Sequence, residues 1–166
     1  MLRPFEISDV DMLHGIWIDP DVRKYLCEGV IISRERALGV VRSHFESAAS
    51  FGVGYWGVHT LGTSQMIGFC GFRFIDSTPR IEIVYGLLPH YWGRGIATEA
   101  SQSALDYVWR STSFSCVWGR TGASNKRSVA LLQRLNMQHV ASTPKLFFYR
   151  IQRPAVPGHD KEIASA

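Results

Sequence analysis

The sequence lacks the features that define membrane-bound, exported and disulfide-stabilised proteins. No window approaches the roughly 18 uninterrupted apolar residues that a membrane-spanning helix needs. The first residues, Met-Leu-Arg-Pro-Phe-Glu, contain no apolar signal core. Three cysteines are present, Cys27, Cys70 and Cys116, and no two of them have Cys-x-x-Cys spacing. We therefore expect no membrane segment, no disulfide framework, and a location in the reducing cytoplasm.

Signals for nucleic acid and metal are also missing. The chain has no basic run with interleaved aromatic residues, and its net charge of +4 is modest for a nucleic-acid-binding protein. His59, His90 and His139 are isolated and show no metal-ligand spacing. We expect neither nucleic acid nor metal as a partner, and we interpret Cys70 as a buried strand residue rather than a nucleophile.

The composition is that of one ordinary globular domain. With 166 residues and 46% hydrophobic residues, the chain is long enough for a packed core and too short for two domains. We place this domain at residues 1–153 and expect the polar, proline-containing tail, 154–166, to be disordered. Apolar periodicity predicts strands over 2–7, 55–60, 66–75, 81–88, 115–120, 139–142 and 146–151, and helices over 9–17, 33–45, 96–108 and 125–135. Ser8, Ser33 and Asn125 are the predicted helix caps.

The most informative segment joins the strand at 81–88 to the helix that begins near Ile96. A glycine turn, Gly93-Arg94-Gly95, lies directly before that helix, and Glu99 lies in its first turn. Glycines before a helix N-terminus leave convergent backbone N–H groups that bind phosphate. The segment is not a P-loop, which needs Gly-Lys-Ser/Thr, and it lacks the third glycine of the dinucleotide fingerprint.

The sequence from Pro89 to Ala100, Pro-His-Tyr-Trp-Gly-Arg-Gly-Ile-Ala-Thr-Glu-Ala, instead resembles that of GNAT-superfamily N-acetyltransferases. Within that superfamily it resembles the ribosomal-protein N-acetyltransferase (RimJ/RimL-type) branch. Trp92 takes the place where most GNAT enzymes have Arg or Gln. The resemblance covers roughly residues 2 to 152. It implies an α/β (α+β) single-domain fold with a mixed, mostly antiparallel sheet of about seven strands, four flanking helices, and a splayed strand pair that forms the cofactor cleft.

The resemblance also implies acetyl-CoA as the co-substrate and assigns residues to it. Backbone N–H groups in the segment Trp92, Gly93, Arg94, Gly95, Ile96 and Ala97 would bind the pyrophosphate. Leu87 and Leu88 would pair with the pantetheine arm like an added strand. Asn125, in Asn125-Lys126-Arg127-Ser128, would cap its helix and contact the pantetheine.

The chemistry is assigned to two residues. Many GNAT enzymes have a tyrosine seven residues after this asparagine to protonate the leaving thiolate, but here that residue is Leu132. The role then falls to Ser128 or to water, with a plain helix hydroxyl as the alternative for Ser128. Glu82, in Ile81-Glu82-Ile83-Val84-Tyr85, is the predicted general base; the alternative is a solvent-facing strand residue.

Some positions depart from the family pattern. Leu135-Asn136-Met137 replaces the usual Leu-Gly-Phe, although Asn tolerates the left-handed conformation that closes a helix. Gly86 stands where relatives often have Trp, which predicts a larger cleft. The segment between Met137 and Leu146 is shorter than usual for the family, so the acceptor site would be either broader or completed by a second subunit in a homodimer. The resemblance favours a primary amine, a protein N-terminus or a small molecule, as acceptor. The competing hypothesis is a non-catalytic acyl-CoA-binding module.

Overall fold

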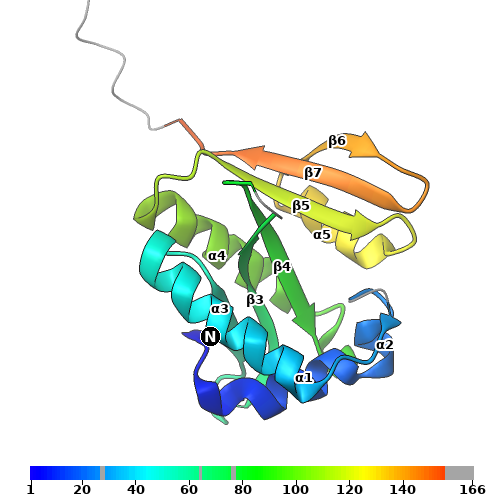
Figure 1. Cartoon of the computed structure of the whole chain (residues 1–166). Helices are drawn as coiled ribbons and strands as arrows, with labels where there is room; N and C mark the ends of the chain where they lie inside the picture. The colour runs from blue at the N-terminus through cyan, green and yellow to red at the C-terminus, as the bar shows by residue number, and fades with distance from the viewer. Residues whose placement is uncertain (27–28, 64, 76–77, 156–166) are drawn as a thin grey trace, which may run out of the picture.

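The computed structural model describes residues 1–26, 29–63, 65–75 and 78–155, and it contains a single seven-stranded sheet (Figure 1). The strand order is β1-β2-β3-β4-β5-β7-β6. The strands are β1 Leu2–Pro4, β2 Tyr55–His59, β3 Met66–Phe74, β4 Ile81–Leu87, β5 Cys116–Gly122, β6 Gln138–Ser142 and β7 Leu146–Gln152. The helices are α1 Val10–Ile18, α2 Pro20–Arg23, α3 Arg34–Phe51, α4 Ile96–Ser111 and α5 Lys126–Arg134, with 3-10 turns η1 Ile7–Asp9 and η3 Pro89–Tyr91.

Every neighbouring strand pair is antiparallel except β4 and β5, which are parallel. This confirms the predicted fold, a mixed and mostly antiparallel sheet with four helices longer than two turns. The predicted strands agree with the observed ones within a few residues. The first is the least accurate, because β1 ends at Pro4 and the chain then turns into η1.

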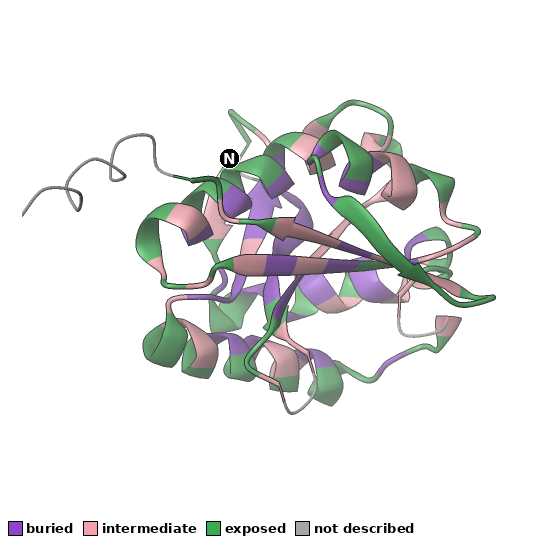
Figure 2. Ribbon diagram, turned by 90° about the horizontal axis from the view of Figure 1, so that it is seen from above, coloured by how far each residue is buried: buried purple, intermediate pink, exposed green. Residues whose placement is uncertain are grey.

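Helices cover both faces of the sheet, and each face has its own apolar cluster (Figures 1 and 2). One cluster joins α4 and α5 to Ile81, Ile83 and Leu87 of β4. The other joins α1 and α3 to Phe69 of β3, with Val84 of β4 packed against it. Because successive strand residues point to opposite faces, β4 contributes to both clusters.

The parallel pair β4 and β5 separates soon after it forms. The two strands are paired only at Ile81 with Val117 and at Glu82 with Trp118, and beyond that point they diverge in Figure 1. β3 remains paired with β4 along its whole length. The predicted splayed pair is therefore present, and the rest of β4 has a free edge toward β5.

Two of the three predicted helix caps are confirmed. Ser33 accepts a hydrogen bond from the backbone N–H of Arg36, and Asn125 caps α5. Ser8 is not a cap: its hydroxyl donates to Glu6. The chain turns at Glu6 instead, because the Asp9 carboxylate accepts the backbone N–H of Glu6 in a capping box.

Smaller predictions have mixed outcomes. Asn136 has a φ of 58°, so it does take the left-handed conformation after α5. Cys70 is fully buried, and burial raises the pKa of its thiol to about 12, which fits a strand residue rather than a nucleophile. No helix in the described part of the chain is both long and apolar enough to cross a bilayer. Cys27 and most of the predicted tail, residues 156–166, lie outside the described residues.

Candidate functional site

A cleft of about 1330 Å³ runs through the gap between β4 and β5. Its lining residues come from both faces of the sheet: Tyr85, Ile96 and Leu131 on the α4–α5 side, and Trp17, Val40 and Phe69 on the α1–α3 side. Pockets for one small ligand usually measure about 300–1,000 Å³. The cleft is therefore larger than a pocket for one small ligand usually is.

The glycine turn forms one end of this cleft. Gly93 and Gly95 have φ values of 74° and 78°, a conformation that side-chain-bearing residues adopt at a cost. A Cβ built at either position meets no atom within 4 Å, so both glycines face open space. These two conformations turn the backbone sharply from η3 into α4.

No side chain caps the N-terminus of α4. The first intrahelical bond is from the N–H of Glu99 to the C=O of Gly95. The N–H groups of Ile96, Ala97 and Thr98 consequently have no partner within the helix, and the helix dipole adds positive potential there. This is the geometry of an anion-binding helix terminus.

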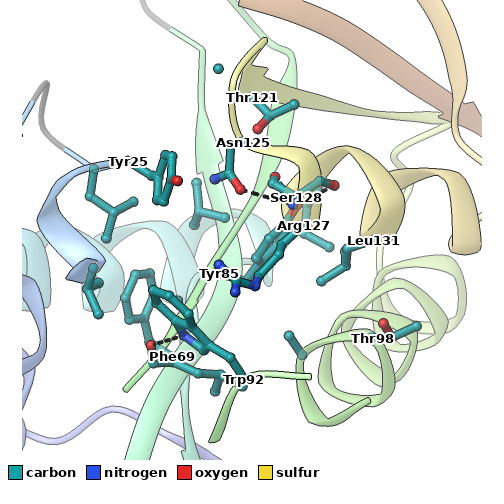
Figure 3. Close-up of a pocket in the computed structure, with 18 of the residues that line it drawn as sticks. Tyr25, Phe69, Tyr85, Trp92, Thr98, Thr121, Asn125, Arg127, Ser128 and Leu131 are labelled. Carbon is teal, nitrogen blue, oxygen red and sulfur yellow. Dashed lines mark hydrogen bonds between the residues drawn. The ribbon is translucent and has the colours of Figure 1, made fainter. Parts of the chain in front are cut away.

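Trp92, which directly precedes the glycine turn, contacts both the end of β4 and the start of α5. Its indole N–H donates to the C=O of Leu87 at 2.7 Å, which holds the segment after β4 against the strand end. The guanidinium of Arg127 lies 5.1 Å from the centre of its ring. Trp92 therefore links the glycine turn to the start of α5 (Figure 3).

Leu87 and Leu88, the two leucines predicted to pair with pantetheine, differ in where their backbone N–H and C=O groups point. Leu88 uses both backbone groups inside the protein: its N–H donates to Ile67 of β3, and its C=O accepts the N–H of Tyr91 as η3 begins. The strand-like role predicted for Leu88 is thus not supported. Since hydrogen-bonding direction alternates along a strand, Leu87 directs its N–H and C=O to the edge that faces β5, where its C=O already accepts the Trp92 indole N–H.

Asn125 and Ser128 occupy the opposite wall, at the start of α5. The Asn125 side-chain oxygen accepts the N–H of Ser128 at 3.1 Å, as the cap prediction requires. The Ser128 hydroxyl is 2.7 Å from the hydroxyl of Tyr85 on β4 (Figure 3). Ser128 is therefore part of a hydroxyl pair inside the cleft, not an isolated surface hydroxyl.

The sequence analysis did not single out Tyr85 as a candidate site residue. It lies beside the point where β4 leaves β5 and lines the cleft. Burial, the largest influence, raises the pKa of its hydroxyl well above the ordinary value, so the group is a neutral hydrogen-bond donor at physiological pH. Alternation along the strand puts Tyr85 on the same side of β4 as Ile81 and Ile83, the side that packs against α4 and α5, but nothing in the sequence predicted Ser128 as its partner.

Glu82 is buried, with 4% of its surface exposed, and is not the solvent-facing residue considered as an alternative. Arg73 of β3 contacts its Oε1 at 2.6 Å and Arg120 of β5 contacts the same oxygen at 3.2 Å. Glu82 is also the last β4 residue paired with β5. The carboxylate therefore joins three strands just before the cleft opens, and it lines the cleft.

Gly86 does not enlarge the cleft as predicted. A Cβ at Gly86 would come within 2.7 Å of the Phe69 ring, its register partner on β3. The aromatic ring therefore takes the space that a side chain at Gly86 would need.

Within the described residues, no group of three or more His, Cys, Asp or Glu is arranged to hold a metal.

The sequence matches a known family. The sequence profile of the acetyltransferase (GNAT) domain matches residues 1–138. The chain belongs to the GNAT acetyltransferase family. It is 30% identical over 138 residues to an uncharacterized N-acetyltransferase, p20, from Bacillus licheniformis, covering 82% of this chain and 78% of that protein.

Solved GNAT structures share the fold. The spermidine N-acetyltransferase from Vibrio cholerae, in complex with CoA and spermine, has a TM-score of 0.78 at 16% identity, covering 92% of this chain and 95% of that one. RimL, the ribosomal L7/L12 alpha-N-protein acetyltransferase in complex with coenzyme A, has a TM-score of 0.75 at 16% identity, covering 91% and 92%. These two GNAT neighbours differ in acceptor, so the fold alone does not select one.

Proposed function

We propose that this protein transfers an acetyl group from acetyl-CoA directly to a primary amine, within one ternary complex. The observation that carries the proposal is the uncapped N-terminus of α4, preceded by two left-handed glycines, at the end of a cleft that passes between splayed strands. Family membership supplies the reaction class, and structural neighbours that hold CoA support the donor.

The residues at the N-termini of α4 and α5 fit a ligand that carries a pyrophosphate. The N–H groups of the α4 terminus would bind the pyrophosphate, and Gly93 and Gly95 leave room for it. Lys126 and Arg127 lie in the first turn of α5, where a cation opposes the helix dipole unless an anion is near. Leu87 and Asn125 would contact the pantetheine arm, and the thioester supplies an acetyl group activated by a good leaving group.

Tyr85 and Ser128 would return a proton to the departing thiolate. Their hydroxyls are 2.7 Å apart in the cleft wall, so one donates to the other and the pair presents a proton to a third atom. Burial raises the pKa of Tyr85, so its proton would move to the thiolate only as Ser128 and water replace it. The pair takes over the role that other family members give to the tyrosine replaced here by Leu132.

Glu82 would accept the proton of the attacking ammonium, directly or through water. Both arginine contacts end on Oε1, so the proposed acceptor atom is Oε2. Of the carboxylates that line the described cleft, the other is Glu99, which lies beside the glycine turn at the cofactor end. Glu82 is therefore the better placed for the acceptor amine.

The acceptor proposed here is a protein N-terminus or a small-molecule amine, with the ribosomal-protein branch as the favoured relative. A cytoplasmic location and a homodimer remain predictions from the sequence. The rival function is acyl-CoA binding without catalysis, which the leucine at position 132 favours.

Calorimetric titration with acetyl-CoA, followed by thiol release with an amine panel, tests the proposal. We expect saturable binding, amine-dependent release, and about tenfold or greater weakening of binding in Gly95→Ala, because a Cβ enters the anion site and the φ of 78° becomes strained. Gly62→Ala, at another left-handed glycine away from the cleft, is the matched control. Binding without turnover on any amine would favour the rival.

A further inference from the structure

A second cavity, of about 280 Å³, lies at the start of β4, at the opposite end of that strand from the glycine turn. We call it the arginine pocket. Its lining comes from the segment before β4, from β5 and the residues before it, and from β7: Pro79, Arg80, Phe114, Ser115, Cys116, Trp118, Arg150 and Gln152. It shares no described lining residue with the large cleft, so the two are separate sites.

The sheet places Arg80 and Arg150 on the two sides of β5, on the face that also holds Glu82. Trp118 of β5 is the register partner of both Glu82 on β4 and Arg150 on β7. Arg80 precedes Glu82 by two residues, so alternation directs both to this face. The Arg80 guanidinium carbon lies over the Trp118 ring, 5.2 Å from its centre. Trp118 therefore holds one arginine and adjoins the other.

No carboxylate neutralises either arginine in the described part of the chain. Arg73 and Arg120, on the same face, share Glu82. The guanidinium groups of Arg80 and Arg150, by contrast, form no ion pair or hydrogen bond with a described residue, and the Nε of Arg150 is enclosed without a partner there. No acidic side chain is among the described residues that line the arginine pocket. The pocket therefore carries two positive charges that the described protein leaves uncompensated.

The two charges act on one part of the pocket. Burial raises the pKa of the Cys116 thiol, and the charges of Arg150 and Arg80 both oppose that rise. Ser115 and Gln152 add a hydroxyl and an amide to the lining. Guanidinium groups bind oxyanions through charge-assisted hydrogen bonds. Because the cavity is smaller than the roughly 300–1,000 Å³ of a usual ligand site, it suits a small oxyanion rather than a cofactor.

We propose that the arginine pocket binds a phosphate dianion, either as inorganic phosphate or as the phosphate group of a small monoester. Its oxygens would accept hydrogen bonds from the terminal guanidinium nitrogens of Arg80 and Arg150, since the Nε of Arg150 is enclosed. The ion would bridge the start of β4 to β7 across β5. This inference goes beyond the proposed function and does not depend on it.

A ¹H–¹⁵N NMR titration with inorganic phosphate tests the proposal in the wild-type protein, at about pH 8, where phosphate is mainly dianionic. Chloride keeps the ionic strength constant. We expect saturable shifts at the backbone N–H groups of Cys116, Trp118 and Gln152, while shifts at Ile96 and Ala97 report separately on the proposed cofactor site. Phosphate should bind at least tenfold more tightly than acetate, because a dianion interacts more strongly with two guanidinium groups.

Glycerol 3-phosphate distinguishes the two sources of phosphate in the same titration. Affinity equal to or above that of inorganic phosphate would assign the site to a monoester. Affinity tenfold lower would assign it to the free ion, because the cavity would then exclude the glycerol group.

The variants Arg80→Gln and Arg150→Gln each remove one charge from the arginine pocket. We expect each to weaken phosphate binding about tenfold or more, from the loss of a charge-assisted hydrogen bond, and Arg80→Lys to bind more tightly than Arg80→Gln. Arg110→Gln, at an exposed arginine of α4 that does not line the pocket, removes the same charge elsewhere and is the matched control. The comparison of phosphate with acetate in the wild type needs no variant to fold.

No saturable shift at the three pocket residues, or equal affinity for phosphate and acetate, would overturn the inference. Unchanged affinity in both Gln variants, or an equal loss in Arg110→Gln, would also overturn it. Phosphate shifts confined to Ile96 and Ala97 would refute the arginine pocket and keep the proposed cofactor site. Phosphate binding at the arginine pocket without acetylation of any amine would support this inference and refute the proposed function.

Discussion

Replacing Tyr85 with Phe tests the hydroxyl pair in the cleft. The change removes one oxygen, which lies 2.7 Å from the Ser128 hydroxyl, and keeps the ring. One such hydrogen bond contributes about 1 kcal/mol to stability. General acid catalysis typically gives 10²–10⁴-fold, but a thiol with a pKa near 8.5 is a good leaving group. We therefore expect kcat to fall about 10- to 100-fold.

The KM for acetyl-CoA should change little, because the proposed pyrophosphate site at Gly93 and Gly95 is untouched. The pH dependence is a second readout. Burial raises the pKa of Tyr85, so its proton remains bound through neutral and mildly basic pH, and the ratio of wild-type to variant kcat should stay constant from pH 6.5 to 8.5. Steady-state thiol release at saturating amine measures both.

Tyr107→Phe, on the outer part of α4, is the control for loss of a tyrosine hydroxyl. Ser128→Ala should give a loss similar to that of Tyr85→Phe, and the double variant should lose less than the product of the two, because the groups act together. A kcat within twofold of wild type, with unchanged thermal stability, would refute the acid role of Tyr85.

Three further predictions concern the cleft walls and the core. Glu82→Gln should lower kcat at least tenfold and stability by roughly 1–3 kcal/mol, because a buried group loses its charged contacts with two half-exposed arginines; turnover and urea unfolding measure the two effects, and unchanged turnover would remove Glu82 as the base. Gly86→Ala should cost about 1–3 kcal/mol through overpacking against Phe69 and raise KM for the amine more than for acetyl-CoA; an unchanged acceptor KM would contradict our placement of the acceptor. His44 accepts the Tyr55 N–H through Nδ1, and burial lowers its pKa from 6.5. The unfolded chain therefore binds a proton first, so the free energy of unfolding should fall as pH drops below about 6.5, and His44→Gln should flatten that slope in thermal unfolding.

The geometry of the glycine turn was predictable because it is local. Gly93, Gly95 and the start of α4 at Ile96 are adjacent in sequence, and residues that adopt positive φ and end a strand are recognisable by type. The Asn125 cap was predictable for the same reason, since its partner is three residues away. The strands and helices followed from apolar periodicity over whole segments.

Contacts between distant residues were not predictable. Tyr85 and Ser128 are 43 positions apart, and Arg120 is 38 positions from Glu82. The pairing of β4 with β5 at Glu82, and the packing of α5 against the same face as Tyr85, bring these groups together. The backbone partners of Leu88 were not predictable either, because the direction of its N–H depends on pairing with β3, which a single strand does not reveal.

The most direct test of the central claim follows the acetyl group. Acetyl-CoA labelled with ¹³C in the acetyl group is mixed with the protein and an amine from the panel that supports thiol release, and mass spectrometry locates the label. The account predicts one labelled N-acetyl product for each free coenzyme A, with no labelled protein when the amine is omitted. Thiol release without a labelled amine, or a labelled protein that passes its acetyl group on later, would contradict direct transfer within this cleft.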